Sequence, residues 1–482
     1  MSKALLLAAG VAVLYVSFLT ASHYWDGVLF SLVIEKVAGG VLPFAALLHP
    51  NHLLYSPLGY GLYQVLHFFR LPVRSISALQ FLNVLASVLC SVLVFRMCRR
   101  CFRSRDLAWS CTILFALGAT WWRFSTDADA YIVSVLFCVA AVGCVLVARA
   151  RLVAAGVCLS VAMLFHELAV LAYIPILAAI WLERSATRER VRRASAFVLL
   201  TSACVGSAYY VAYIWTHSDP STQPFIQWVT SVSNDTKTTH SVGQLVASNG
   251  TSYLKLFAGG KLGLIRDFLS APVIIALLIC VLCVAATIGS AIRARATKRF
   301  MPAELDRRTR TVLWSWFAVY FVFLSWFEPG NAFYKLFAWP PIVVLLGCYL
   351  DRYGRAPKAF GWFTLGLASW NFAAFIYPHS HVEADPVLSL ARRIDKELPR
   401  SATVYYKALS PDDWYLQYFA PGRKWEPLGN PNEIGKGSAE APVCYESTAL
   451  PYVRAETDSS LSWSLVNSQH NIRLQCVKPK AD

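Results

Sequence analysis

Apolar runs of about twenty residues recur along most of this chain and are separated by short polar loops. Runs of that length and composition form helices that cross the hydrocarbon core of a bilayer. We predict about eleven such helices, and the ranges that follow the pattern are 4–21, 75–95, 107–122, 131–147, 152–165, 168–181, 196–215, 271–292, 311–327, 336–350 and 360–377. The pattern therefore predicts an all-α polytopic membrane domain over residues 1–377.

Two stretches depart from this pattern. Residues 22–74 are apolar but broken by Glu35-Lys36, by Gly39-Gly40 and by prolines. We predict that this first extracytoplasmic loop lies along the membrane interface as short amphipathic pieces. An alternative with two further spans would place His49 and His52 on the side of the membrane opposite Asp26. The second loop, 217–269, is rich in Ser, Thr and Asn, and we expect short interfacial helices there.

The positive charge of the chain indicates its orientation. The net charge is +16, yet only 15% of residues are charged, against about a quarter in soluble proteins. Lys and Arg crowd into the short loops 96–105, 149–151, 184–193, 293–310 and 352–358. The positive-inside rule assigns these loops and the N-terminus to the cytoplasm, so the charge does not indicate a nucleic-acid partner. We expect a multi-pass protein of the plasma membrane, which in a bacterium is the inner membrane.

Residues 378–482 form a polar tail, which by this topology is extracytoplasmic. A helical stretch over 386–398, a strand over 402–409 and many turn residues predict a small α/β domain. Cys444 and Cys476 are the two cysteines in this tail. They could form a disulfide if the tail lies in an oxidising compartment.

Polar and ionisable side chains gather in the turns that this topology places on the outer face. These are Asp26, His49, His52, Arg123, Asp127, Asp129, His166, Glu167, Glu328 and Lys335. A carboxylate at a membrane boundary can keep a raised pKa and act as a general base toward a hydroxyl group. Aromatic side chains near the same turns could stack on sugar faces, although an interfacial aromatic belt would have the same composition. They are Tyr24, Trp25, Trp121, Trp122, Tyr131, Trp326, Phe333 and Tyr334.

The order of these motifs resembles the GT-C superfamily of glycosyltransferases, which includes protein O-mannosyltransferases and aminoarabinose transferases. The resemblance covers roughly residues 1–215, and Asn51 stands where the family has a second proline. It rests on Trp25-Asp26-Gly27, His49-Pro50-Asn51-His52, Pro57-Leu58-Gly59, Phe81-Leu82-Asn83 and Asp127-Ala128-Asp129-Ala130-Tyr131.

The resemblance implies a role for several of these residues. Asp26 would be the base that activates the acceptor hydroxyl, and Asp127 or Asp129 would orient the acceptor or a divalent ion. A Mg or Mn ion between Asp26 and Asp127 is the corresponding cofactor expectation. His49 and His52 would line the donor side, and Arg123 or Lys335 would stabilise the departing phosphate. We keep His166, Glu167 and Glu328 as further candidates for substrate binding, although His166 could cap a helix and Glu328 could simply end a span.

The resulting hypothesis is a glycosyltransferase that moves a sugar from a polyprenyl-phosphate-linked donor to a hydroxyl on the extracytoplasmic side. The partners would be the lipid bilayer, this donor and an acceptor that is a protein, a lipid or a polysaccharide. Two alternatives stay open: a transporter or flippase of a lipid-linked or amphipathic solute, and a non-catalytic subunit with the same fold. A transporter would place polar residues near mid-span, whereas the predicted spans are nearly free of charge.

Overall fold

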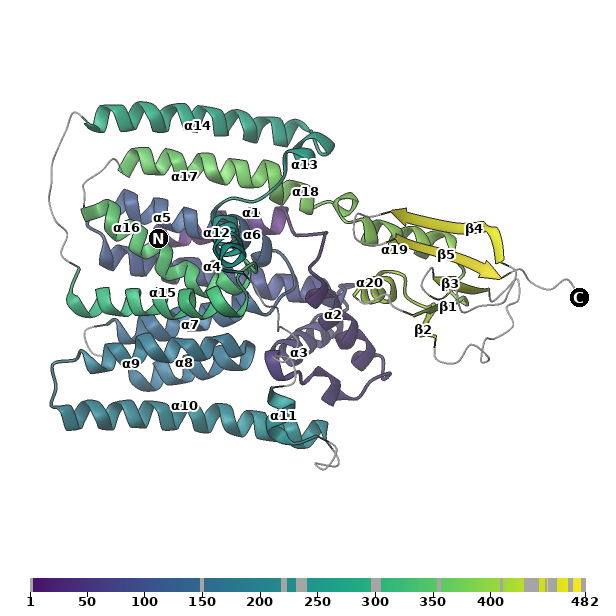
Figure 1. Ribbon diagram of the computed structural model, residues 1–482, viewed down its shortest axis with the longest axis horizontal. Helices are drawn as coiled ribbons and strands as arrows, with labels where there is room; N and C mark the ends of the chain where they lie inside the picture. The colour runs from purple at the N-terminus through teal and green to yellow at the C-terminus, as the bar shows by residue number, and fades with distance from the viewer. Residues whose placement is uncertain are drawn as a thin grey trace, which may run out of the picture.

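The computed structural model describes residues 3–147, 151–217, 223–230, 241–295, 305–352, 357–407, 411–428, 442–446, 449, 457–466 and 471–477. Most of the chain is helical, and the long helices lie side by side in one bundle (Figure 1). A smaller unit of helices and strands sits at one end of this bundle. The predicted combination of many helices with a small C-terminal unit that contains a sheet is confirmed.

Five helices of the described chain are long and apolar enough to cross a membrane. They are α4 (Ser75–Cys101), α10 (Thr187–Thr216), α14 (Ala271–Arg295), α15 (Arg307–Phe327) and the run that begins with α17 (Pro357–Asn371). Shorter apolar helices accompany them: α1 (Lys3–Ser17), α7 (Tyr131–Val145), α8 (Leu152–Phe165) and α9 (Tyr173–Trp181), the last preceded by η3 (Glu167–Ala172). The total of about eleven spans stays a prediction.

Several predicted spans are built from two helical pieces. The helices α5 (Arg105–Leu117) and α6 (Ala119–Ser125) follow one another with only Gly118 between them. A Cβ atom at Gly118 would lie 2.7 Å from the Trp339 ring and 2.8 Å from the Leu256 carbonyl oxygen, so glycine permits this close packing. In the same way η5 (Tyr334–Ala338) runs into α16 (Trp339–Arg352).

Burial separates the centre of the bundle from its surface. Within the most apolar stretch of α4, 61% of residues are buried, against 17% in α14. The side chains of α14 that point outward are nevertheless apolar, for example Ile275, Leu278 and Leu282. A continuous exposed apolar surface of this kind is what a lipid-facing helix requires.

The segment 22–74 forms short helices at the bundle end that faces the C-terminal unit (Figure 1). It contains α2 (Trp25–Ala38), η1 (Phe44–Leu47), η2 (Pro50–His52) and α3 (Tyr55–Phe68). Both α2 and α3 have 14 residues, which gives a length of about 21 Å. That is shorter than the bilayer core of about 30 Å, and neither helix is among the candidate spans.

The second long loop also contains helices. They are α11 (Phe225–Val229), α12 (Val242–Phe257) and α13 (Leu262–Asp267), while residues 218–222 and 231–240 lie outside the described part. A capping box between Ser241 and Gln244 starts α12, which then packs against α6, η5 and α15. The residues of α12 thereby reach the centre of this end of the bundle, where Leu256 is fully buried.

The last span continues through η6 (Phe372–Ile376) and α18 (Tyr377–His379) into the C-terminal unit. This unit contains a five-stranded sheet in the order β2-β1-β3-β5-β4. Its helices are η7 (Val382–Ala384) and α19 (Pro386–Glu397), which come before the first strand, and α20 (Asp412–Phe419), which lies between β1 and β2 in the chain. The strands are β1 (Thr403–Tyr406), β2 (Lys424–Pro427), β3 (Val443–Glu446), β4 (Thr457–Val466) and β5 (Asn471–Val477). β1 pairs in parallel with β2 and β3, and β5 is antiparallel to β3 and β4.

The disulfide expected in the tail is formed. Cys444 on β3 lies directly opposite Cys476 on β5, and the two sulfur atoms are bonded. Both residues are buried in the sheet, so this bond links neighbouring strands within the core of the unit.

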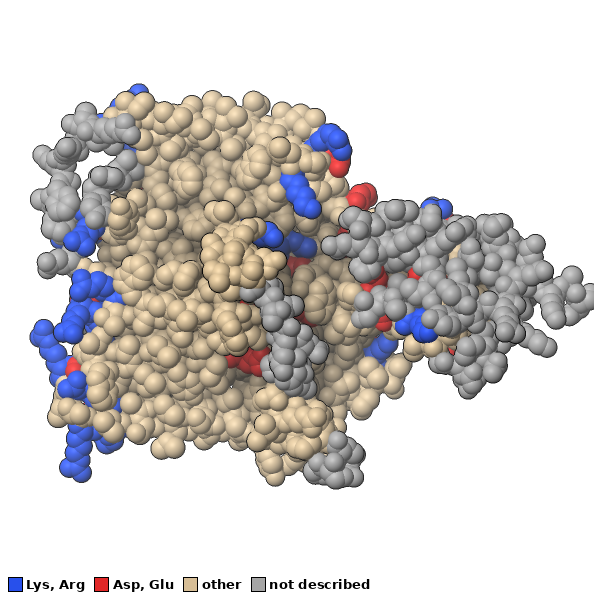
Figure 2. Space-filling view, in the orientation of Figure 1, with Lys and Arg blue, Asp and Glu red and all other residues tan. Residues whose placement is uncertain are grey.

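Basic side chains gather at the other end of the molecule. Figure 2 shows Lys and Arg concentrated at the bundle end that lies away from the C-terminal unit. Arg99 and Arg100 in the last turn of α4 and Arg352 in the last turn of α16 belong to this end. The charge pattern predicted from the loops is therefore a feature of the folded bundle, and its assignment to the cytoplasm stays a prediction.

Candidate active site

Asp26 is the second residue of α2 and is half-buried where α2 begins. The start of this helix is tied to the loop 126–130, because the Tyr24 backbone N–H donates to Asp127 Oδ2 over 2.8 Å. Gly27 allows the two segments to touch. A Cβ atom on Gly27 would lie 2.1 Å from the Ala128 carbonyl oxygen, far inside contact distance.

Asp127 is the anchor of this arrangement. Its carboxylate lies 2.9 Å from His23 Nδ1 and accepts a hydrogen bond from Arg123 Nη1 over 3.2 Å. It also accepts hydrogen bonds from the backbone N–H groups of Tyr24 and Ala128, over 2.8 and 2.9 Å. Burial alone would raise the pKa of Asp127, but Arg123 and then His23 hold it below its ordinary value. A carboxylate has about four acceptor positions, so these contacts occupy Asp127 fully and leave none for substrate or metal.

The guanidinium group of Arg123 also has its hydrogen-bond partners within the protein. Besides its pairing with Asp127, its Nη2 donates to the Ser22 carbonyl oxygen, and the side chain is buried on α6. The guanidinium therefore joins α6, the loop 126–130 and the segment just before α2. Its charge is balanced by Asp127 rather than directed at an open site.

Asp129 differs from Asp127 because its carboxylate is buried without a hydrogen bond of normal geometry. Asn83 on α4 fixes the loop by donating to the main-chain oxygens of Asp127 and Asp129 over 2.8 and 2.7 Å. Burial, followed by the charges of Asp26 and Asp127, raises the pKa of Asp129 well above its ordinary value, although the Ala130 and Tyr131 amides oppose this.

Asp26 and Asp129 are thus the two carboxyl groups that influence one another in the site. Burial raises the pKa of Asp26 to about 7. Because the two carboxyl groups interact, ionisation of one favours the protonated form of the other. One carboxyl group is then available as a base near neutral pH, and the other stays neutral.

A cluster of rings extends from this pair across the end of the bundle. Tyr24 contacts Phe333 with ring centroids 5.0 Å apart, and Phe333 contacts Tyr131, also at 5.0 Å. Tyr131 in turn lies 4.6 Å from the His166 ring and 6.0 Å from the His52 ring. The predicted site residues from three different turns therefore line one continuous aromatic surface.

The three histidines of this cluster are neutral near pH 7. Burial and the neighbouring His49 lower the pKa of His52 to about 3, and burial also lowers the pKa of His49. His166 accepts the Leu168 backbone N–H at Nδ1 over 3.1 Å, which leaves the proton on Nε2. His166 is thus the helix cap considered in the sequence and also a neighbour of His52, whose ring centroid is 4.8 Å away.

His49 is the most open of the three histidines. Its Nδ1 accepts from the Asn51 backbone N–H over 3.4 Å, and its side chain is exposed. The proton of the neutral ring then sits on Nε2. His49 consequently offers a hydrogen-bond donor to a ligand.

Glu167 and Glu328 lie close enough to Tyr334, a member of the same ring cluster, to affect its pKa. The pKa of Tyr334 is raised to about 12, mainly by burial. A hydrogen bond with Tyr131 opposes this rise, while the negative charges of Glu328, then Asp26, then Glu167 add to it. Tyr334 therefore lies where the acidic turns of three separate segments meet.

Lys335 instead points into the protein. Its ammonium group donates to Asn249 Oδ1 over 2.8 Å, to the Pro329 carbonyl oxygen over 2.6 Å and to Ser252 Oγ. An ammonium group has three protons, so these contacts use all of them. Burial lowers the pKa of Lys335 to about 8, while Glu328 opposes this change. The side chain pins α12 to the loop between α15 and η5.

The aromatic residues proposed for sugar stacking divide into different environments. Trp121 and Trp122 are fully buried in the bundle, and Trp326 is 76% exposed on its outside. Trp25 is at the rim of the site and contacts Trp414 of α20, with ring centroids 5.7 Å apart. Of the predicted set, Tyr24, Trp25, Tyr131, Phe333 and Tyr334 lie around the acidic pair.

The C-terminal unit completes the rim, which the sequence did not predict. The Tyr415 hydroxyl donates to the His23 carbonyl oxygen, three residues before Asp26. A second contact joins Arg74 to Glu35 through two hydrogen bonds of 2.8 Å and to the Tyr418 carbonyl oxygen over 2.9 Å. Such pairings between residues more than 300 positions apart leave no local signal in the sequence.

Few side chains of the site are available to hold the expected divalent cation. Among the described residues, no group of three or more His, Cys, Asp or Glu side chains is arranged to hold a metal ion. Asp127 is saturated by its own contacts. Mg²⁺ is commonly bound through one or two carboxylates, with water and substrate phosphate as its other ligands, so a divalent cation at Asp26 and Asp129 stays a prediction.

No family model matches this chain, and no curated protein matches it in sequence. Solved structures do match in fold. The crystal structure of ArnT from Cupriavidus metallidurans bound to undecaprenyl phosphate aligns with a TM-score of 0.60 and 11% identity, covering 98% of this chain and 97% of ArnT. The apo state of ArnT aligns with a TM-score of 0.53 and 12% identity over the same shares. The chain therefore has the ArnT fold along nearly its whole length, which confirms the GT-C-like fold predicted from its motifs.

Proposed function

We propose that this protein is a glycosyltransferase of the GT-C type that uses a polyprenyl-phosphate-linked sugar as donor. The observation that carries the proposal is the pairing of Asp26, with a pKa near 7, with Asp129, whose pKa is also raised, beside a cluster of aromatic and histidine rings. The fold shared with ArnT supports the same reading, since one ArnT structure holds undecaprenyl phosphate.

In the proposed reaction Asp26 accepts the proton of an acceptor hydroxyl group. The hydroxyl oxygen attacks the anomeric carbon of the donor, the bond from that carbon to the phosphate oxygen breaks, and the lipid phosphate leaves with the electron pair. A base is most effective when its pKa is close to the working pH, which Asp26 satisfies. Asp129 in its protonated form, which burial and the nearby charge of Asp26 favour, adds no second negative charge to the site.

Other residues position the reacting groups. Arg123 and Lys335 donate their hydrogen bonds to groups of the protein itself. His49 therefore supplies the hydrogen bond to the leaving phosphate through its Nε2 proton. Phe333 and Tyr334 are half-buried and offer ring faces on which a sugar can stack, and Tyr131 is buried against them. These rings exclude water from the carboxyl pair. Asp127 keeps the loop that carries Asp129 against α2.

The site is proposed to face the extracytoplasmic side of the membrane. It lies at the bundle end away from the Lys and Arg clusters (Figure 2), and this is the end that bears the disulfide-bonded C-terminal unit. Disulfides persist in oxidising compartments, so both features agree with the same orientation. The acceptor is a protein, lipid or polysaccharide that reaches this surface.

Cells with and without the gene provide the test. Mass spectrometry of lipid extracts and of envelope glycans should show one sugar missing from the envelope of the deletion strain. The corresponding polyprenyl-phosphate sugar should accumulate in its lipids. Identical lipid-linked and envelope sugars in the two strains would refute the proposed function.

A further inference from the structure

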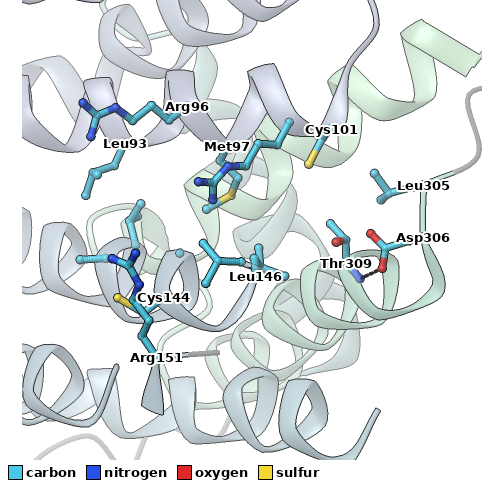
Figure 3. A pocket seen from close by; sticks show the side chains of 15 residues that line it. Leu93, Arg96, Met97, Cys101, Cys144, Leu146, Arg151, Leu305, Asp306 and Thr309 are labelled. Carbon is cyan, nitrogen blue, oxygen red and sulfur yellow. Dashed lines mark hydrogen bonds between the residues drawn. The ribbon is translucent and has the colours of Figure 1, made fainter. Parts of the chain in front are cut away.

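A cavity lies at the basic end of the bundle, away from the acidic pair. It has a volume of about 350 Å³ and opens between the C-terminal ends of α4 and α7 and the N-terminal ends of α8 and α15 (Figure 3). These four elements are separated in sequence, so the cavity is a product of the tertiary fold.

Three arginines line this cavity. Arg96 and Arg100 are one helical turn apart on α4, and Arg151 stands across from Arg96 at the start of α8 (Figure 3). Residues four apart share one face of a helix, so both α4 arginines can turn toward the cavity. All three are exposed, and none forms a hydrogen bond or ion pair through its guanidinium with another described residue.

This pattern differs from that of other arginines at the same end. Arg193 and Arg308 both pair with Glu183, and Arg192 pairs with Glu189. The one carboxylate in the cavity wall, Asp306, accepts the Thr309 backbone N–H over 3.0 Å and caps α15. Three guanidinium groups and one carboxylate thus line the cavity, which gives its wall a net positive charge.

The rest of the wall is apolar. Leu93, Val139, Gly143 and Leu146 continue the cavity along the sides of α4 and α7. A ligand that fits both parts has an anionic head and an apolar body. Basic pockets between transmembrane helices on the cytoplasmic side have the chemistry that recognises anionic lipid headgroups.

We propose that this cavity binds the phosphate group of an anionic phospholipid from the leaflet on the basic side of the membrane. Arg96, Arg100 and Arg151 contact the phosphate, and the acyl chains follow the apolar surface between α4 and α7. The site is independent of Asp26 and of the proposed transfer reaction.

The test measures lipid retention by the purified full-length protein. Native mass spectrometry compares binding of phosphatidylglycerol with binding of phosphatidylcholine, and inorganic phosphate at millimolar concentration serves as the competitor. One variant carries Arg96→Gln, Arg100→Gln and Arg151→Gln. The matched control carries Arg105→Gln, Arg188→Gln and Arg310→Gln, which removes the same charge from the same end outside the cavity.

The wild type should retain phosphatidylglycerol in preference to phosphatidylcholine, with little effect of inorganic phosphate. Removal of the three cavity arginines should weaken this retention about 10- to 100-fold, because each surface-proximal cation contributes up to about a fivefold factor. The control variant should bind like the wild type. A third variant with Lys at positions 96, 100 and 151 should restore most of the binding and shows that the fold tolerates change there.

Three results would overturn the proposal. Equal losses in the cavity and control variants would indicate a diffuse basic surface. Full displacement by inorganic phosphate would indicate a site for a free anion. Equal retention of the two lipids by the wild type would remove the headgroup preference on which the site depends.

Discussion

The Nδ1 atom of His23 lies 2.9 Å from Oδ1 of Asp127, although 104 positions separate the two residues in sequence. This contact joins the segment before α2 to the loop between α6 and α7. It places Asp26 and Asp129 within electrostatic reach of one another. Asp127 therefore serves as a positioning residue, and Asp129 is the second carboxyl group of the site.

Replacement of Asp127 by Asn should destabilise the protein. The change leaves the buried Arg123 without its carboxylate, and breaking a buried ion pair costs about 3–5 kcal/mol. We expect the unfolding temperature of the detergent-purified variant, measured by circular dichroism, to be clearly lower than that of the wild type. An unchanged unfolding temperature would show that Arg123 and His23 do not depend on this carboxylate.

The same ion pair predicts an acid dependence of stability. The pKa of Asp127 is lower in the folded protein than in the unfolded chain. Its stabilising contribution is therefore complete above the unfolded value of about 3.9 and is lost as the pH falls through the folded value. Wild-type unfolding temperatures should fall more steeply with acidification below about pH 4 than those of Asp127→Asn. Parallel curves for the two proteins would contradict this assignment.

Replacement of Gly27 by Ala should disturb the site without any change of charge. The added Cβ atom would press on the Ala128 carbonyl oxygen and push apart the segments that carry Asp26 and Asp129. Overpacking of this kind costs about 1–3 kcal/mol, and a displacement of about 1 Å can lower a rate about 100-fold. Gly61→Ala on α3 is the matched control, because nothing lies within 4 Å of its Cβ position. Equal sugar transfer by the two variants in membrane vesicles would refute the close-approach argument.

The transfer rate should rise with pH up to about 7 and then level off. Asp26 has to be ionised to accept a proton, and burial raises its pKa to about 7. Below that pH the rate should fall about tenfold per unit, since each unit reduces the ionised fraction tenfold. Right-side-out membrane vesicles allow the outer pH to be set directly. A rate independent of pH between 5 and 8 would contradict a base of this pKa.

Asp129→Asn should retain most of the activity near neutral pH. Burial and the charges of Asp26 and Asp127 raise the pKa of Asp129 and favour its protonated form, and Asn is a neutral group of similar shape. We expect a rate within about tenfold of the wild type and an unchanged midpoint of the pH profile. A loss as large as that of Asp26→Asn would show that Asp129 itself acts as an ionised group.

Removal of the disulfide should affect stability more than transfer. Cys444 and Cys476 are 32 residues apart, and closing a loop of that length stabilises a fold by about 3–4 kcal/mol in the chain-entropy model. The double variant Cys444→Ser and Cys476→Ser should expose the C-terminal unit to proteolysis at lower temperature. Limited proteolysis under non-reducing conditions measures this. Unchanged protease resistance would show that the bond contributes little to this unit.

Local patterns in the sequence were sufficient for much of the fold. Apolar runs located the helices of the bundle, and the breakers around Glu35-Lys36 and Gly39-Gly40 indicated that α2 and α3 are short. These features depend on residues close together in the chain. The helix over 386–398 and the strand beginning near 402 followed from the same kind of signal.

The roles within the site depended on long-range contacts that local patterns do not contain. Asp127 and Asp129 are two residues apart and look alike in sequence, yet one meets Arg123 and His23 while the other meets Asp26. Lys335 seemed suited to bind a phosphate. Its ammonium group instead donates its three hydrogen bonds to Asn249, Ser252 and the Pro329 carbonyl oxygen. The contact of Tyr415 with His23 depends on a domain interface, which no single motif indicates.

The most direct test of the account is the replacement of Asp26 by Asn in cells that lack the native gene. Asp267→Asn on α13 is the control, since the one ion pair that Asp267 forms with the described residues is an exposed pair with Arg266. Mass spectrometry of envelope glycans and lipids from the complemented strains is the measurement. We predict that Asp267→Asn restores the missing envelope sugar, whereas Asp26→Asn leaves the envelope unmodified and the polyprenyl-phosphate sugar accumulated. Full restoration by Asp26→Asn would contradict the assignment of Asp26 as the catalytic base.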